Sequence, residues 1–243
     1  LNYSFNEKYL FEANVRYDGT SRFTEIGRWG LFPSLSAGWR ISEESFIKDN
    51  VRWIYNLKLR ASWCKLGNQN IGNYPYQNVL SLGQNYSIGG LLASGASLTT
   101  LSNADIHWES TQVTDIGLDL AMLKGKLSMV FDYFDKTTSE ILYNISVSQV
   151  LGFNPSSVNA GEVRNKGFEV LLNYQASIGE LKLGIIPNFS DVKNEVTKLA
   201  SVQQDISKGL FVVQPLNAIY CYVADGLFVN ANDIANYPAQ PYS

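Results

Sequence analysis

Alternation of apolar and polar residues is the feature that most limits what this chain can fold into. Between residues 9 and 17 every odd-numbered position is apolar, and the even-numbered positions include acidic, amide and basic side chains. The pattern recurs between residues 31 and 41, with Phe32 as its exception, and between residues 55 and 63. Successive side chains of a β-strand point to opposite faces, so each stretch predicts a strand with one apolar and one polar face.

A short turn at Lys124-Gly125 predicts how two further strands pair, because a two-residue turn determines which residues lie opposite each other. The predicted pairs are all apolar: Met122 with Leu127, Leu120 with Met129, Leu118 with Phe131, and Ile116 with Tyr133. The other face then carries small and acidic residues, namely Asp115, Gly117, Asp119, Ser128 and Asp132. This register separates an apolar face from a polar one.

A second turn is predicted at Ile178-Gly179. It gives three more apolar pairs, namely Tyr174 with Leu183, Leu172 with Ile185, and Phe168 with Phe189. From the two registers together we expect one apolar face that would contact lipid if the strands cross a membrane, and it contains Leu118, Leu120, Phe131, Leu172 and Ile185.

The composition narrows the class of protein. No window approaches the roughly 18 uninterrupted apolar residues that a membrane-spanning helix needs, and the mean hydropathy is −0.09. A net charge of −3 leaves no basic excess for phosphate contacts, so nucleic acid is not an expected partner. The aromatic content of 13% favours a transmembrane β-barrel, in which only alternate residues face lipid, but it also suits a soluble β-sandwich.

The predicted connections alternate in length. Long connections are expected near residues 65–108 and 138–165, tight turns at 124–125 and 178–179, and an intermediate connection at 43–52. Outer-membrane barrels have short periplasmic turns and longer extracellular loops. Aromatic residues fall toward the ends of several predicted strands, as an interfacial girdle requires: Tyr17, Trp39, Trp63, Tyr133, Tyr174 and Phe189.

Residues suited to nucleophilic or metal chemistry are few. His107 is the only histidine, and it lies beside Trp108 just before a predicted strand, which favours a structural role. Cys64 and Cys221 lie far apart without metal-binding spacing, so they predict neither a zinc site nor a disulfide framework. We therefore expect no catalytic, cofactor-binding or metal-ligating residue, and no enzyme activity.

Two further patterns invite a functional interpretation that the sequence does not support. Asp115, Asp119 and Asp132 share the predicted polar face, but charges lining a water-filled barrel explain them without a carboxylate site. Gly89 and Gly90 are adjacent in a Ser- and Leu-rich loop that lacks the further glycines and the lysine of a phosphate-binding loop.

Several segments, in a fixed order along nearly the whole chain, resemble the SusC/RagA family of TonB-dependent outer-membrane transporters. They are residues 16–23 (RYDGTSRF), 29–34 (WGLFPS), 38–44 (GWRISEE), 56–62 (NLKLRAS), 67–72 (GNQNIG), 108–109 (WE) with 116–119 (IGLD), 165–169 (NKGFE) and 222–228 (YVADGLF). Two departures stand out, because Leu66 replaces the Thr usual before Gly-Asn-Gln, and the tail from Pro238 does not continue into the expected acidic repeat.

The resemblance implies an all-β fold of antiparallel transmembrane strands with long extracellular loops, forming part of a barrel. Residues 1–243 would belong to the β-barrel domain of a larger transporter, whose plug domain, TonB-contacting segment and closing C-terminal strand lie outside this sequence. Members of the family import oligosaccharides or peptides across the outer membrane beneath a SusD-like surface lipoprotein. The resemblance therefore implies that lipoprotein, the TonB complex, the substrate and the lipid bilayer as partners.

One alternative stays open on sequence alone. A soluble all-β carbohydrate-binding or adhesion module would also carry exposed aromatic residues in its loops. The long connections contain aromatic and other apolar residues, among them Tyr74, Tyr76, Tyr86, Leu151 and Phe153. We expect these connections to form part of the substrate and lipoprotein surface, although their apolar residues could equally pack against one another.

Overall fold

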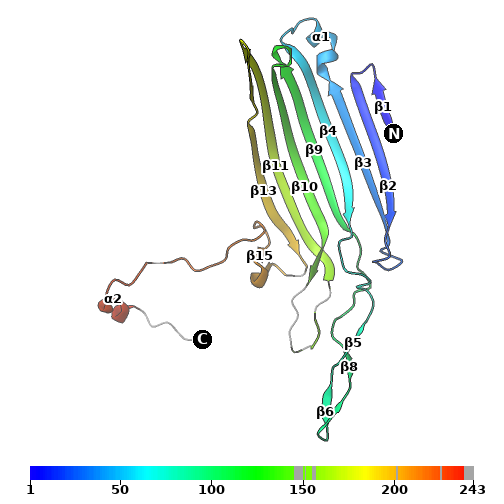
Figure 1. Cartoon of the computed structure of the whole chain (residues 1–243), viewed down its shortest axis with the longest axis vertical. Coiled ribbons are helices and arrows are strands. Elements are labelled where there is room, and N and C mark those ends of the chain that lie inside the picture. The colour runs from blue at the N-terminus through cyan, green and yellow to red at the C-terminus, as the bar shows by residue number, and fades with distance from the viewer. Residues whose placement is uncertain (145–149, 151, 155–156, 201, 225, 238–243) are drawn as a thin grey trace.

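The computed structural model describes residues 1–243 except 145–149, 151, 155–156, 201, 225 and 238–243. The predicted loop residue Leu151 and the end of the chain from residue 238 therefore lie outside the described residues, as does Asp225 of the 222–228 segment. Nine strands form one antiparallel sheet (Figure 1). They are β1 (Asn2–Phe5), β2 (Tyr9–Gly19), β3 (Trp29–Arg40), β4 (Ile54–Asn68), β9 (Glu109–Met122), β10 (Leu127–Asn144), β11 (Ser157–Ile178), β12 (Leu181–Ile185) and β13 (Asn188–Leu199).

The order across the sheet follows the order along the chain, from β1 through β4 to β9, β10 and β11. Both β12 and β13 pair with β11, so together they form one edge that is interrupted at Ile186 and Pro187. Proline lacks a backbone N–H, and such a residue is tolerated where it sits at the edge of a sheet. The carbonyl of Pro187 still accepts a hydrogen bond of 3.0 Å from the backbone N–H of Leu172.

The smaller elements lie in the connections. The β3–β4 connection contains the short helices η1 (Ile41–Glu43) and α1 (Ser45–Lys48). The β4–β9 connection contains two ribbons built from β5 (Leu80–Leu82), β6 (Tyr86–Ile88), β7 (Leu91–Ala93) and β8 (Ala96–Leu98). The remaining elements are η2 (Leu123–Gly125), β14 (Gln204–Asp205), η4 (Ile206–Lys208), β15 (Leu210–Phe211) and α2 (Ala231–Asn236). None of the helices in the described ranges is long and apolar enough to cross a membrane.

The first predicted hairpin is confirmed. Met122 lies opposite Leu127, and Leu118 lies opposite Phe131, as the turn at Lys124-Gly125 requires. Lys124 and Gly125 have φ values of 58° and 85°, which is the left-handed region that a tight hairpin turn needs at its centre.

The second predicted register is wrong by two residues. Tyr174 lies opposite Ile185 rather than Leu183, and Ile178 remains in the strand, opposite Leu181. The turn therefore has Gly179 in its first central position, with φ of 61°, which is the place that a type II′ turn reserves for glycine. A shift of two residues preserves the alternation, so Leu172 and Ile185 still lie on the apolar face.

Tight and long connections lie at opposite ends of the sheet (Figure 1). The predicted loop at 138–165 is mostly strand, because β10 continues to Asn144 and β11 begins at Ser157. A bulge near Glu140, whose φ is 55°, interrupts the alternation of apolar and polar residues there. The pairing of β10 with β11 beyond this point therefore could not be predicted from the alternation. The loop predicted at 65–108 starts only after Asn68, which pairs with Glu109.

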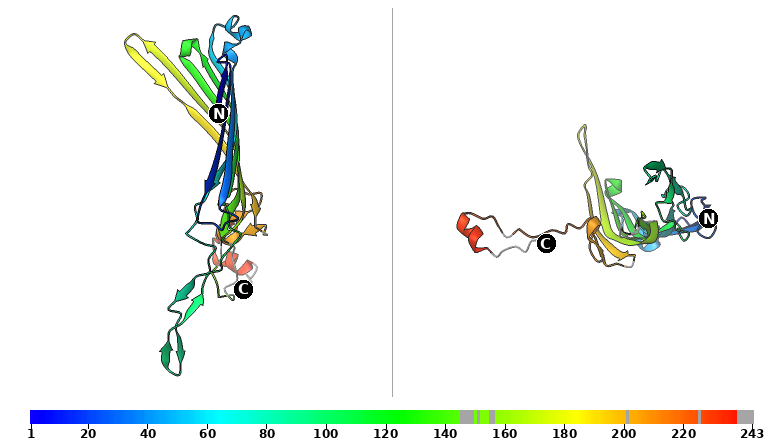
Figure 2. Two further views of the ribbon diagram at one scale, coloured as in Figure 1. Left: turned by 90° about the vertical axis from the view of Figure 1, so that its right-hand side faces the viewer. Right: turned by 90° about the horizontal axis from the view of Figure 1, so that it is seen from below.

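The sheet is a single curved and twisted layer (Figure 2). Its large apolar side chains stay exposed, with Val15 at 69%, Tyr17 at 64% and Phe189 at 62% of their accessible surface. The few buried apolar residues gather toward the long-connection end, where Phe23 and Ile106 are fully buried and Val163, Val196 and Leu199 form a second small core. A soluble β-sandwich would bury the apolar face under another layer.

Candidate functional surfaces of the sheet

The apolar face is bounded by stacked aromatic pairs. At the tight-turn end the rings of Tyr9 and Trp39 stack with centroids 6.4 Å apart, and toward the long-connection end those of Tyr17 and Trp29 stack at 5.0 Å. Eight residues separate Tyr9 from Tyr17 along β2, which at about 3.3 Å per residue is roughly 26 Å of strand. A transmembrane β-barrel has an apolar band about 25 Å tall between two aromatic girdles, and a strand tilted by about 35–45° covers roughly 20 Å of that height over this length.

The rows of side chains across this face confirm the facing predicted from the sequence. One row runs from Leu59 through Leu118 and Phe131 to Val170. Leu120 lies in the next row, between Leu57 and Met129. Beyond the row that contains Tyr133 and Phe168 the same face becomes charged, because Asp135 lies opposite Lys166.

The opposite face carries an ion triad centred on Arg60 of β4. Its Nε atom donates to Asp119 of β9 at 3.0 Å, and its Nη2 atom donates to Asp132 of β10 at 2.8 Å. The three side chains are between 23% and 31% exposed, so they are partly shielded from water. The predicted polar face is thus a network that joins three neighbouring strands.

Gly117 makes that network possible. It lies opposite both Arg60 and Asp132, and a Cβ atom at this position would come within 2.6 Å of Arg60 Nη2 and 2.4 Å of Asp132 Oδ1. The missing side chain leaves the space through which the guanidinium group of Arg60 reaches across β9. The alternation of apolar and polar residues predicts that Gly117 lies on the polar face, but it gives no signal for this role.

Asp115 and His107 are the remaining residues that the sequence singled out, and both have neighbours that belong to the sheet and its connections. Asp115 lies on the polar face, opposite Ser62 and Phe134. The ring of His107 contacts the backbone carbonyl of Asp105 through Nδ1 at 2.7 Å. Among the described residues, no group of three or more His, Cys, Asp and Glu side chains is arranged to hold a metal ion.

Phe32, the exception to the alternation of β3, is central to an aromatic cluster at the long-connection end. Its ring lies edge-on to Trp108, with centroids 5.2 Å apart, and Trp108 also contacts the buried ring of Phe23. Side chains at Gly30 or Gly67 would collide with Phe32, because their Cβ atoms would lie 2.4 and 2.0 Å from its Cζ atom. Segments that resemble the SusC/RagA family therefore meet at one place in the structure.

Hydrogen bonds join the bases of the long connections. The side chain of Arg22 donates to the carbonyl of Gln69 at 3.0 Å, and the indole of Trp108 donates to that of Arg28 at 3.1 Å. The side-chain Nδ2 atom of Asn159 donates to the backbone carbonyl of His107, and its Oδ1 atom accepts from the backbone N–H of His107. These contacts connect the 20–28 loop, the 69–108 connection and the start of β11 into one platform.

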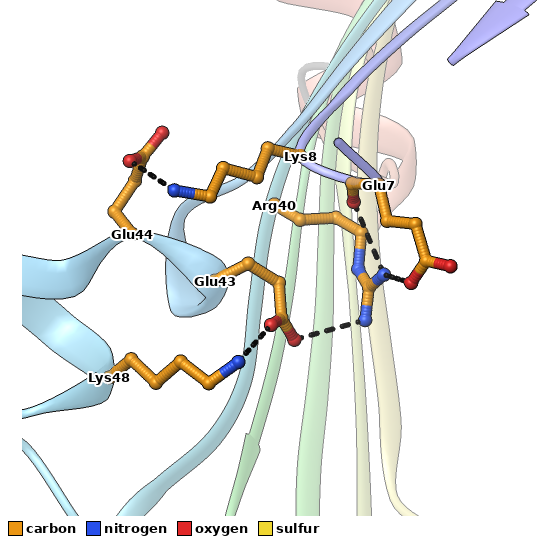
Figure 3. Close-up of polar contacts among 6 residues, drawn as sticks. All are labelled: Glu7, Lys8, Arg40, Glu43, Glu44 and Lys48. Carbon is orange, nitrogen blue, oxygen red and sulfur yellow. Dashed lines mark hydrogen bonds and ion pairs between the residues drawn. The ribbon is translucent and has the colours of Figure 1, made fainter. Parts of the chain in front are cut away.

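The tight-turn end is held by a cluster of ion pairs (Figure 3). Glu43 binds Lys48 at 2.9 Å and Arg40 at 3.2 Å, and Arg40 also donates to the backbone carbonyl of Glu7 at 3.2 Å. Because Glu7 belongs to the β1–β2 turn, the cluster ties that turn to the β3–β4 connection. The hydrogen bond from Lys48 holds the pKa of Glu43 below its ordinary value.

Glu44 connects the same end to the aromatic girdle. Its carboxylate accepts hydrogen bonds from the Tyr9 hydroxyl at 2.7 Å, from Lys8 Nζ at 3.0 Å and from the Trp39 indole at 3.2 Å. These donors stabilise the charged form of Glu44 and lower its pKa. The sequence pattern gives no signal for this contact, which joins residues 35 positions apart.

Comparison with known proteins identifies the family. Residues 1–231 match the family described as "TonB dependent receptor-like, beta-barrel". The chain belongs to this family. It is 35% identical over 232 residues to TonB-dependent receptor P39 of Formosa agariphila, and 35% identical over 205 residues to TonB-dependent receptor SusC of Bacteroides thetaiotaomicron. These alignments cover 94% and 82% of this chain.

Solved structures of the RagAB peptide importer are also similar. In its "closed-closed" state the match has a TM-score of 0.79 at 26% identity and covers 88% of this chain. The chain spans only 22% of P39, 20% of SusC and 24% of the matched RagAB chain.

As a member of the TonB-dependent receptor family, whose proteins are outer-membrane β-barrels, the chain forms part of an antiparallel transmembrane barrel. Its uncovered apolar face with girdles at both ends fits the lipid boundary of such a barrel, and its polar face fits the lumen. The alternative of a soluble all-β module is not supported.

Proposed function

We propose that this chain is part of the wall of a TonB-dependent transporter that imports a large nutrient, an oligosaccharide or a peptide, across the outer membrane. The observation that carries the proposal is the separation of the two faces. The outer one is apolar between the pairs Tyr9–Trp39 and Tyr17–Trp29, and the inner one carries the Arg60 triad. The similarity to SusC and to the RagAB peptide importer supports transport, and no enzyme activity is proposed.

The proposal places the tight-turn end in the periplasm and the long-connection end outside the cell, as in outer-membrane barrels generally. It also gives the transporter a plug domain and a TonB-contacting segment outside residues 1–243, and a SusD-like lipoprotein at the outer surface. The platform at the bases of the long connections would then face substrate and lipoprotein. The two substrate classes rest on the similarity to SusC and to the RagAB peptide importer. Tyr74 and Tyr76 pack against each other, with centroids 6.2 Å apart, and do not favour one class over the other.

The topology is tested on intact cells that express the full-length transporter, after replacement of Cys64 and Cys221 by Ser. A membrane-impermeant thiol reagent should label Ser87→Cys in the 69–108 connection and should not label Lys124→Cys in the tight turn until the outer membrane is opened. The reverse pattern would overturn the orientation.

The transport function is tested separately. Uptake of labelled oligosaccharide and peptide mixtures should depend on both the transporter and the TonB complex. Uptake that persists after removal of TonB would contradict active import.

A further inference from the structure

We propose that the tight-turn end of the wall carries a binding site for the headgroup of an anionic phospholipid in the periplasmic leaflet, an inference that rests on the function proposed above. Three cationic side chains form the site. Arg52 belongs to the β3–β4 connection, and Lys124 and Lys126 belong to the β9–β10 turn. We call these three residues the basic cluster, and all three are exposed.

Backbone hydrogen bonds bring the two connections together. The N–H of Leu123 donates to the carbonyl of Trp53 at 3.3 Å, and Arg52 and Lys124 are the next residues beyond this contact. The N–H of Lys126 in turn donates to the carbonyl of Leu123 at 3.3 Å. The three cations, which come from segments about 70 positions apart in the chain, are therefore held close together by the fold.

The basic cluster lies directly beyond the last apolar row of the outer face. Each of its residues is one or two positions away from a member of that row in the sequence, and Trp53 and Leu123, which lie between, are 58% and 54% exposed. Aromatic side chains and long cationic side chains are typical of the level at which a membrane protein meets the lipid headgroups. The row consists of Ile54, Met122, Leu127 and Tyr174.

The acidic residues nearby have other partners. Glu43 binds Arg40 and Lys48, and Glu44 binds Lys8 (Figure 3). Asp49 is the remaining acidic residue of the β3–β4 connection, and the β9–β10 turn contains none. Among the residues that the structure describes, no carboxylate lies within ion-pair distance of the basic cluster. Like charges held close together repel one another, so an anionic ligand would stabilise this arrangement.

The position of the basic cluster in the sheet leaves its outer side to lipid. The cluster lies at the ends of β4, β9 and β10, which have neighbouring strands on both sides. Strands outside residues 1–243 would extend the sheet at its two edges, at β1 and at β12 with β13. A plug domain would approach from the polar face, because it fills the lumen. Neither would cover the outer side of the cluster.

The chemistry of the basic cluster fits a phosphate diester that carries a net negative charge. The guanidinium group of Arg52 can donate two parallel hydrogen bonds to phosphate oxygens, and each lysine adds a point charge. Clusters of Lys and Arg beside a membrane attract anionic headgroups. An acidic periplasmic protein would satisfy the same charges, but the continuity of the cluster with the lipid-facing row favours phospholipid, whose acyl chains would lie along that row.

The test measures which lipid lies next to the basic cluster in the full-length transporter. The protein carries a fluorophore on Asn50→Cys, after replacement of Cys64 and Cys221 by Ser, and is placed in vesicles of phosphatidylethanolamine and phosphatidylglycerol. One of the two lipids has brominated acyl chains, which quench the fluorophore at short range. We expect phosphatidylglycerol to quench at least about twofold more strongly per molecule, and about 0.5 M salt should weaken this preference by screening the charges.

Two variants test whether the basic cluster causes the preference. Arg52→Gln with Lys124→Gln and Lys126→Gln should remove it, because the variant has no charge at the site. Arg52→Lys with Lys124→Arg and Lys126→Arg keeps the three charges and should keep the preference. Each variant must first show the wild-type gel mobility of a folded barrel. If the neutral variant does not fold, the salt dependence of the wild-type protein decides.

The matched control removes three cations beyond the opposite end of the outer face, and it should leave quenching at residue 50 unchanged. It combines Lys65→Gln, Lys166→Gln and Lys193→Gln. Equal quenching by the two lipids in the wild type, or a preference that survives high salt or the neutral variant, would overturn the proposal. Cross-linking of Lys124 to the plug domain or to a periplasmic protein would assign the cluster to a protein partner instead. Quenching is measured without TonB, so failure of TonB-dependent uptake would refute the transport function and leave this result standing.

Discussion

Replacement of Gly117 by alanine tests whether the Arg60 triad contributes to the stability of the wall. The added Cβ atom would lie 2.4 Å from Asp132 Oδ1 and 2.6 Å from Arg60 Nη2, and both atoms are at the ends of flexible side chains. They can therefore move away, but only by breaking their 2.8 Å contact. Exposed ion pairs contribute about 0.2 to 1 kcal/mol and the loss of one partner of a buried pair costs about 3 to 5 kcal/mol. For side chains that are about a quarter exposed we expect a loss of about 1 to 2 kcal/mol.

A double-mutant cycle isolates this contact from other effects of the substitution. In an Asp132→Ala background the clash with Asp132 and its ion pair are both gone, and the guanidinium group of Arg60, no longer held by Asp132, can move away from the added Cβ atom toward Asp119. Gly117→Ala should then cost close to nothing, because alanine is no worse than glycine in a strand. The free energy of unfolding is measured on the full-length transporter in lipid vesicles, by urea titration followed by gel mobility. Equal losses in the two backgrounds would refute the role assigned to Gly117.

Two further predictions concern the apolar face and the tight-turn end. Leu118→Arg places a charge on the apolar face and should cost about 2 to 4 kcal/mol if the site is near the bilayer midplane, whereas Asp119→Asn on the other face should cost much less. Equal losses of folded barrel would contradict the facing. Because the pKa values of Glu43 and Glu44 are lowered below 4.5, their contacts are complete above that pH and are lost as the pH falls through the folded-state values. The protection factors for hydrogen exchange at residues 41–50, which correct for the slower intrinsic exchange in acid, should therefore fall as the pH falls through these values, and the Glu43→Gln, Glu44→Gln double variant should lose this dependence.

The strands and their facing could be predicted from the sequence because both depend on local pattern. A period of two, together with a turn at Lys124-Gly125, is sufficient to determine which residues share a face. The second hairpin shows where this reasoning ends. Either neighbour of Gly179 can complete a two-residue turn, and both registers place apolar residues opposite one another. The choice depends on which central position of the turn the glycine occupies, and the alternation pattern does not contain that information.

The extent of the strands was harder to predict than their existence. The stretch from Thr138 to Asn144 contains β-branched and aromatic residues that pair with β11, but the bulge at Glu140 shifts the alternation by one position. A pattern that changes phase looks like the start of a loop. The wall therefore continues along β10 and β11 beyond the aromatic girdle, as paired strands whose apolar face has become charged.

The residues that break the alternation are the ones that give this wall its specific contacts. Phe32 is apolar on the polar face, and its ring occupies the space left by Gly30 and Gly67 before it meets Trp108. Gly117 is an empty position on the same face, and Arg60 uses the space to reach Asp132. Gly67 with Phe32 and Gly117 with Arg60 are each a glycine on one strand and a large side chain on another strand, far away in the sequence, so neither contact can be predicted from one segment alone. Regular alternation builds a barrel wall of any kind, whereas these paired exceptions determine where its loops are anchored and how its inner charges are joined.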